Sequence, residues 1–269
     1  MKTSDYPIGI FDSGVGGLGV FQSITKLLPQ QDIVYVAGNK YLPFGEKTTE
    51  QIQQISEKIV RFLIDKHQVK MVVIACNTAT VASIAYLRTR FSIPFVGVVP
   101  VVKPACKQTK TGCVAILSTP LTADGSYIND LIQKFGRGVK VLSIGCPGLA
   151  DLVEAGKVET PEMEALLCNL VAPAMKHNAD IIGLCSTHYP FIRDQLQKIV
   201  GQSVVILDSN EPVARQVKRV VATLPQSDTT AGRQAQYQFY ATADAEKFKA
   251  VAQQLVGNTV VCDVQLIDL

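Results

Sequence analysis

Short, almost continuously apolar runs alternate with longer amphipathic segments along most of this chain. Strands of a parallel sheet are covered by helices on both faces, so their sequences are apolar throughout rather than alternating. The longer amphipathic segments suit the helices that connect such strands. The pattern therefore predicts an α/β fold in which mainly parallel sheets are flanked by helices.

The expected strands cover residues 8–11, 32–37, 71–75, 95–99, 113–118, 139–144, 181–185 and 204–207. The expected helices cover residues 17–28, 48–67, 78–90, 123–135, 161–177, 190–200 and 212–224. Thr160 before Pro161 is typical of a helix start, with an N-cap and then a proline at the first helical position.

Two strand ends are alike, because residues 74–78 and 183–188 both lead from an apolar strand into thiol and hydroxyl side chains. Polar strand ends are common in α/β proteins, and a single sheet is the alternative. We favour two similar lobes with the active site in the cleft between them. The first would hold residues 1–98 plus 208–269 and the second residues 99–207. A tail strand at 236–241, a helix at 243–256 and a strand at 259–266 should pack onto the first lobe.

The composition limits the classes of protein to consider. With 47% hydrophobic and 18% charged residues, the chain can bury a sizeable core. The net charge of +3 is small and the basic residues are scattered, so no nucleic-acid partner is expected. Residues 1–7 do not resemble a signal peptide, and no apolar run approaches a membrane span. The seven cysteines are scattered and form no C-x-x-C pair. We therefore expect a protein of the reducing cytoplasm, without disulfides and without a metal site.

Cys76 directly follows an apolar run and directly precedes Asn77 and Thr78. Open α/β sheets bind ligands at the carboxyl ends of their strands. The N-terminus of a helix also lowers the pKa of a thiol, because its free N–H groups favour the thiolate. We therefore expect a functional thiol here; the alternative is a small buried hydrophobic residue.

The first strand ends in a glycine-rich loop, in which Gly14, Gly16 and Gly19 match the dinucleotide-binding fingerprint in form. No acidic residue follows the second strand to hold a ribose, and Asp12 and Ser13 precede the glycines. We favour a loop that presents these two side chains and its own N–H groups to a small carboxylate ligand.

His188 is one of three histidines and follows Cys185, Ser186 and Thr187 at the end of an expected strand. This cluster favours a functional histidine; the alternative is a capping or core residue. The rigid loop at 43–45 could wrap a ligand or form a simple turn, and Glu154 could assist catalysis or be a solvated helix charge.

Together, these segments resemble the bacterial glutamate racemases over nearly the whole chain. Residues 8–18 are similar to the opening signature of that family, and residues 75–79 to its first catalytic cysteine motif. Residues 43–45 resemble its substrate loop, and residues 152–154 its Leu-Val-Glu element. Residues 187–190 are similar to the end of its second cysteine motif.

The resemblance implies cofactor-independent interconversion of L- and D-glutamate, which supplies D-glutamate for peptidoglycan. Two thiols on opposite faces of the substrate's α-carbon would exchange protons with it. Cys76 would be one of them, assisted by Asp12, and Glu154 with His188 would assist the other. The resemblance implies substrate binding by Asp12, Ser13, Pro43, Phe44, Gly45, Asn77, Thr78, Thr187 and His188. The protein could form a homodimer, and the sequence does not decide this.

The chain departs from the family pattern at the second cysteine motif. Aligned without a gap, Ser186 occupies the catalytic cysteine position and Cys185 the preceding glycine position. Three hypotheses stay open. A strand bulge turns Cys185 inward and restores the pair, or Ser186 serves weakly and leaves an impaired, slow or one-sided racemase, or a related one-thiol decarboxylase or isomerase acts on a small diacid. A non-catalytic homologue that binds an acidic ligand is a further alternative.

Overall fold

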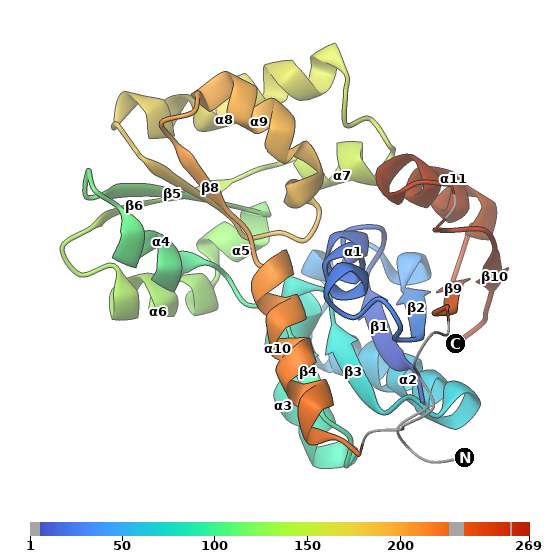
Figure 1. Ribbon diagram of the computed structural model, residues 1–269. Coiled ribbons are helices and arrows are strands. Elements are labelled where there is room, and N and C mark those ends of the chain that lie inside the picture. Colours follow the sequence, from blue (N-terminus) through green and yellow to red (C-terminus); the bar gives the residue numbers. More distant parts are fainter. Residues whose placement is uncertain (1–5, 226–233, 259) are drawn as a thin grey trace. The chain divides into compact units, whose positions relative to one another are not determined.

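The computed structural model describes residues 6–225, 234–258 and 260–269. The N-terminal residues 1–5 and Thr259, the first residue of the last expected strand, lie outside this part of the chain. Contacts divide the chain into unit 1, Met1–Val98 with Asn210–Leu269, and unit 2, Val99–Ser209. The expected division placed residues 208 and 209 in the first lobe instead. Most helices and strands of both units are labelled in Figure 1.

Unit 1 contains a parallel sheet, whose strand order within the described residues is β10-β9-β2-β1-β3-β4. The strands are β1 Ile8–Asp12, β2 Ile33–Ala37, β3 Met71–Ile74, β4 Phe95–Gly97, β9 Tyr237–Ala241 and β10 Val264–Leu266. Strand β9 pairs with β2 in parallel, from Ile33 opposite Tyr237 onward. The C-terminal tail therefore packs onto the first lobe, as predicted.

Helices cover both faces of the unit 1 sheet (Figure 1). They are α1 Leu18–Leu27, α2 Thr49–His67, α3 Asn77–Arg90, α10 Asn210–Thr223 and α11 Ala245–Val256. Along β2, Val34 and Val36 join the buried cluster that contains the apolar side of α2. Tyr35, between them, contacts the rings of Phe21 on α1 and Phe248 on α11. Because both faces are buried, the strand is apolar without alternation.

Unit 2 contains a second parallel sheet, with the order β6-β5-β7-β8 among the described strands. Its strands are β5 Cys113–Ser118, β6 Lys140–Gly145, β7 Ile181–Leu184 and β8 Val205–Leu207. Its helices are α4 Val102–Gln108, α5 Pro120–Asp124, α6 Ser126–Phe135, α7 Leu149–Glu154, α8 Pro161–Lys176 and α9 Arg193–Val200. The 3-10 segments are η2 Asn39–Tyr41 and η3 Phe44–Glu46 in unit 1 and η4 Tyr189–Ile192 in unit 2.

Some helix boundaries differ from the expected ones. The single helix expected at 123–135 is interrupted, because Gly125 has an extended backbone that separates α5 from α6. Helices α4 and α7 are not among the expected helices, although Glu154 at the end of α7 was considered as a helix charge. The predicted start of α8 is confirmed: the side chain of Thr160 accepts a hydrogen bond of 3.2 Å from the N–H of Met163.

Each sheet has a point where the strand order reverses direction. Strand β1 lies between β2 and β3, and strand β5 lies between β6 and β7. Ligands of open α/β sheets bind outside the carboxyl ends of the strands at such points. In unit 1 these ends carry Asp12 and Cys76, and in unit 2 the end of β7 leads into Ser186 and His188.

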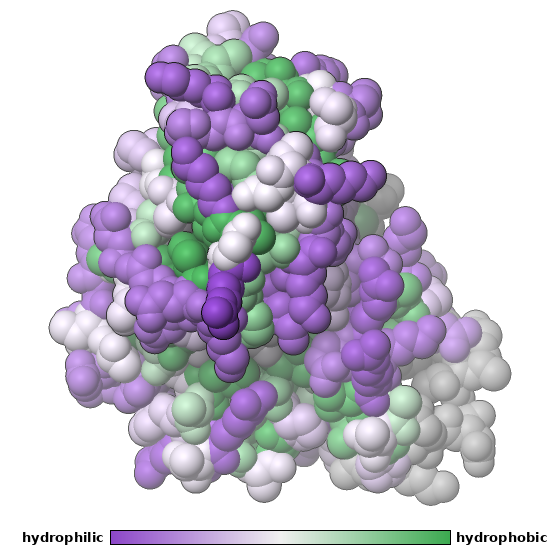
Figure 2. Space-filling view, turned by 90° about the vertical axis from the view of Figure 1, so that its left-hand side faces the viewer, coloured by the Kyte–Doolittle hydropathy of each residue, from purple (hydrophilic) through white to green (hydrophobic). Residues whose placement is uncertain are grey.

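Hydrophilic and hydrophobic residues are interspersed on the face shown in Figure 2. The large apolar side chains that are exposed come from separate elements, for example Val81 on α3, Leu121 on α5 and Leu266 on β10. Within the described residues, no helix is both long enough and apolar enough to cross a bilayer.

Candidate active site

Cys76 lies just beyond β3 and is the N-cap residue of α3. Its backbone is extended, and its sulfur takes the place of a capping oxygen, accepting a 3.5 Å hydrogen bond from the N–H of Ala79. The thiol also donates to the hydroxyl of Ser13, with an Sγ–Oγ distance of 3.8 Å. The sequence therefore correctly predicted a thiol at the junction of a strand and a helix.

The expected lowering of the Cys76 pKa is wrong. Burial and the nearby charge of Asp12 raise the pKa of this thiol to about 12. The N–H of Ala79 and the contacts with Ser13 lower it, as a helix N-terminus should, but they do not offset burial. Only 5% of the residue is exposed, so water stabilises the thiolate little.

Asp12 is fully buried at the end of β1, and its Oδ2 atom accepts hydrogen bonds from the loop that follows. The donors are the N–H groups of Gly14, at 3.1 Å, and Gly17, at 3.0 Å. In a dinucleotide site, the N–H groups of this loop face a pyrophosphate. Here the chain's own carboxylate occupies two of them, so the N–H groups of Gly14 and Gly17 already have a partner and face neither a pyrophosphate nor a ligand carboxylate. The carboxylate-ligand interpretation of the glycine loop stays a prediction.

Gly17 shows why this loop needs glycine. A Cβ atom at this position would lie 2.7 Å from Cβ of Asp12 and 2.9 Å from Cβ of Ala75. Both distances are below any normal contact, so a side chain would push Asp12 away from the end of β3.

Tyr35 is a residue that the sequence analysis missed. Its hydroxyl donates a 2.9 Å hydrogen bond to the carbonyl of Gly14, which ties the glycine loop to the middle of β2. The residue lies within an apolar strand, and the only sequence signal was a polar group in an otherwise apolar run. A buried tyrosine hydroxyl usually has such a partner.

Asn77 and Thr78 form the first turn of α3, next to Cys76. The loop at 43–45 approaches the same helix, because η3 packs against α3. Pro43 is exposed, Gly45 is partly buried, and Phe44 lies in the buried cluster that also contains Cys76. Phe44 is thus a packing residue here, and its contact with a substrate stays a prediction.

We call Asp12, Ser13, Cys76, Asn77 and Thr78 the Cys76 tip.

In unit 2, Glu154, Ser186 and His188 form a hydrogen-bonded chain. Glu154 is the last residue of α7, and its Oε1 atom lies 2.6 Å from Nε2 of His188. The other ring nitrogen, Nδ1, lies 3.4 Å from Oγ of Ser186. Ser186 and His188 are each 7% exposed. The predicted partnership of Glu154 with His188 therefore has the geometry of a direct contact.

The chemistry of the Glu154, His188 and Ser186 side chains fixes the direction of the hydrogen bonds between them. A carboxylate only accepts, so Nε2 of neutral His188 carries the hydrogen and Nδ1 is the acceptor. Ser186 accepts a hydrogen bond at Oγ from the N–H of His188, at 3.4 Å. Its own hydroxyl hydrogen can then point to Nδ1. With Cys185 and the buried Thr187, these residues make up the His188 tip.

The Cys185 side chain belongs to the core of unit 2. It lies in a buried cluster with Val102 of α4 and Ile116 of β5. Its N–H donates to the carbonyl of Leu117 at 2.8 Å, which continues the regular pairing of β7 with β5. The strand end therefore has no bulge, contrary to the first of the three hypotheses. Burial raises the pKa of this thiol to about 12.

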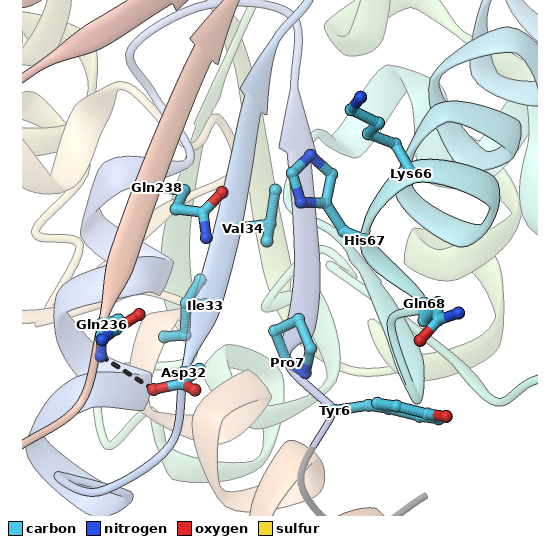
Figure 3. A pocket seen from close by; sticks show the side chains of 10 residues that line it. All are labelled: Tyr6, Pro7, Asp32, Ile33, Val34, Lys66, His67, Gln68, Gln236 and Gln238. Atoms are coloured by element: carbon cyan, nitrogen blue, oxygen red, sulfur yellow. Dashed lines mark hydrogen bonds between the residues drawn. The ribbon is translucent and has the colours of Figure 1, made fainter. Parts of the chain in front are cut away.

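A pocket of about 260 Å³ lies where the strands of the unit 1 sheet begin, at the end of the sheet opposite to the Cys76 tip. It is lined by residues that precede strands, including Pro7 before β1 and Asp32 before β2. Figure 3 shows His67 and Gln238 facing each other across Val34. The Cys76 tip follows its strands instead, so this pocket is separate from the candidate active site.

No group of three or more His, Cys, Asp or Glu side chains that could hold a metal ion occurs in the described part of the chain.

Comparison with known proteins decides the family. The model of the Asp/Glu/Hydantoin racemase family matches residues 13–217. The chain belongs to the Asp/Glu/Hydantoin racemase family. The match includes residues of both units, the whole of the His188 tip, and the Cys76 tip except for Asp12.

Curated relatives of this racemase-family chain carry a more specific name. The chain is 43% identical to a glutamate racemase of Herpetosiphon aurantiacus over 218 residues, covering 81% of this chain and 85% of the relative. It is 38% identical to a glutamate racemase of Ectopseudomonas mendocina over 260 residues, covering 96% of this chain and 97% of the relative.

Solved structures agree with this fold. Glutamate racemase isoform RacE1 of Bacillus anthracis is similar with a TM-score of 0.85 and 30% identity, covering 99% of this chain and 98% of the other. Escherichia coli glutamate racemase, solved with L-glutamate and the activator UDP-MurNAc-ala, has a TM-score of 0.85 and 28% identity, covering 98% of both chains. The predicted α/β fold with two parallel sheets is confirmed.

Proposed function

We propose that this racemase-family chain is a cofactor-independent glutamate racemase that supplies D-glutamate for peptidoglycan. The observation that carries the proposal is the similarity to curated glutamate racemases along 96% of the chain. The Cys76 tip supports it, because a thiol, a carboxylate and hydroxyl groups gather at the strand ends where α/β proteins bind small ligands.

The proposed reaction moves one proton off the α-carbon of glutamate and another onto its opposite face. An unactivated α-C–H bond is a very weak acid, so the base must lie close to it and water must be excluded. Two acid/base groups on opposite faces invert the centre without turning the substrate over. Cys76 is proposed as one of these groups, and the His188 tip is proposed to supply the other.

Asp12 has two proposed roles at the Cys76 tip. Its charge contributes to the raised pKa of Cys76. A substrate ammonium group beside Asp12 would offset that charge and favour the thiolate when glutamate is bound. Asp12 would also hold the ammonium group, while Ser13, Asn77, Thr78 and Thr187 would bind the carboxylates.

The test is α-proton exchange of L- and D-glutamate in heavy water, followed by proton NMR with chiral analysis. The proposal expects both isomers to exchange and invert. Cys76→Ala should abolish racemisation, and Cys168→Ala, at an exposed cysteine, is the matched control. Exchange without inversion would favour a one-thiol enzyme, and binding without exchange a non-catalytic homologue.

A further inference from the structure

At the His188 tip, the one thiol is that of Cys185. The sulfur of Cys185 is buried in the core of unit 2, with Val101 and Val102 around it. The polar group next along the chain is the hydroxyl of Ser186. A serine hydroxyl is far less acidic than a thiol, so an isolated Ser186 could not release and regain a proton at neutral pH.

Ser186 is not isolated, however, because it contacts an imidazole, a side chain that can both accept and donate a proton. Its Oγ atom lies 3.4 Å from Nδ1 of His188. The opposite ring nitrogen lies 2.6 Å from Glu154, which fixes Nδ1 as the proton acceptor in the neutral ring. All three residues belong to unit 2, so this geometry does not depend on the other unit.

We propose that Ser186 and His188 form a two-group proton relay that replaces the second catalytic thiol, with the proton stored on His188. The inference rests on the proposed racemase function and assigns its second acid/base. Ser186 is the catalytic residue that touches the substrate, while His188 acts through it.

The relay balances in both directions. When the relay is the base, Oγ of Ser186 takes the α-proton of glutamate as its own hydroxyl proton passes to Nδ1 of His188. The products are a substrate carbanion, an unchanged serine hydroxyl and an imidazolium ion. When the relay is the acid, the imidazolium returns its proton to Oγ, and the hydroxyl proton passes to the carbanion.

Glu154 is a positioning residue in this scheme. It orients the imidazole so that Nδ1 faces Ser186, and its negative charge stabilises the imidazolium that forms. Its side chain is 22% exposed and that of His188 9%, so this ion pair would be only partly screened by water.

The first experiment compares Ser186→Ala and Ser186→Cys with the wild type in the heavy-water exchange assay. Ser186→Ala should lower racemisation by about 10²- to 10⁴-fold, the usual contribution of a general acid/base. In Ser186→Ala, Cys76 should still exchange the α-proton of one glutamate isomer with heavy water, but that isomer should not be inverted. Ser186→Cys should remain active, because a thiol can hold the proton itself. Ser56→Ala, at a buried serine on α2, is the matched control.

The second experiment separates storage of the proton on His188 from a merely structural role. His188→Gln keeps a donor for Glu154 but cannot take up a proton. In the serine background it should cost at least about 10²-fold in racemisation. In the Ser186→Cys background it should cost less than about tenfold, since the thiol no longer needs His188 to store its proton. Such non-additivity is the mark of two coupled groups.

The outcomes distinguish the relay from the racemase proposal. If wild-type protein exchanges and inverts glutamate but Ser186→Ala is fully active, the relay is wrong and the racemase proposal stands. Equal losses from His188→Gln in both backgrounds would also overturn the relay, because His188 would then be only structural. Absence of exchange with either isomer would overturn both proposals.

Discussion

The hydroxyl of Tyr35, in the middle of β2, donates a 2.9 Å hydrogen bond to the carbonyl of Gly14. The same loop supplies the Gly14 N–H to the carboxylate of Asp12. One loop is therefore held from two neighbouring strands, which fixes the position of Asp12 beside Cys76.

Tyr35→Phe should loosen this loop. The lost hydrogen bond is expected to cost about 1 kcal/mol of stability, measured by urea unfolding. It should also lower kcat/KM for glutamate by up to about tenfold, because tenfold corresponds to 1.4 kcal/mol. Tyr237→Phe is the control, since Tyr237 also contacts the ring of Phe21 but lies on β9. Equal effects of the two changes on kcat/KM would argue against a role of the Tyr35 hydroxyl in the site.

Asp12→Asn should make Cys76 more acidic in the ligand-free protein. The carboxylate raises the pKa of this thiol, and an amide oxygen can still accept the N–H groups of Gly14 and Gly17. Alkylation of Cys76 by iodoacetamide at mildly alkaline pH, followed by peptide mass spectrometry, should become faster. Removal of 1.4 kcal/mol of repulsion would give about tenfold more thiolate.

The same Asp12→Asn change should lower racemisation, because the proposed ammonium contact is lost. Faster alkylation together with slower turnover is thus the expected pair of results. Unchanged alkylation would show that burial alone sets the pKa of Cys76. Alkylation of Cys168 in the same samples gives the control for a general change in exposure.

Cys185→Ala should reduce stability without reducing activity. The side chain fills part of the unit 2 core, so its loss should cost roughly 1–2 kcal/mol. Cys106→Ala, in the same buried cluster, should cost a similar amount in urea unfolding. Loss of racemisation in Cys185→Ala but not in Cys106→Ala would instead identify Cys185 as the second acid/base.

Alkaline pH should destabilise the fold through its buried thiols. Burial raises the pKa of Cys146 and of Cys185 from 9.0 to about 12. Below pH 9 both states hold these protons, whereas at higher pH the unfolded chain loses them first. Each thiol should therefore lower the unfolding free energy by up to about 1.4 kcal/mol per pH unit between pH 9 and 12.

Urea unfolding at several pH values checks this dependence through its slope. Cys185→Ala should make the alkaline decline shallower, whatever its effect at neutral pH. Cys168→Ala, at an exposed cysteine, is the control for the loss of a thiol outside the core. Identical slopes for all three proteins would mean that other groups govern alkaline unfolding.

The strands were predictable because burial on both faces leaves a plain signal. The expected strand 113–118 coincides with β5, and each residue of it is buried. Helices α4 and α7 have seven and six residues and no side-chain cap, so they were too short to show a period. Local sequence could not reveal either helix.

The candidate site was only partly predictable. The location of Cys76 followed from local sequence, but the direction of its pKa did not, because the position of Asp12 and the depth of burial depend on the folded sheet. Glu154 and His188 are 34 residues apart, and only the family resemblance paired them before their contact was seen. Tyr35 looked like an ordinary core residue.

The insertion of unit 2 within unit 1 has a consequence for synthesis on the ribosome. Unit 2 is one continuous stretch, so it can complete its sheet as soon as Ser209 has emerged. The unit 1 sheet must wait for β9 and β10, which pair beside β2. Until then, β2 presents an unpaired apolar edge, the kind of surface that chaperones cover and that invites aggregation. The segment that follows unit 2 in the sequence thus completes the sheet whose first strands precede unit 2.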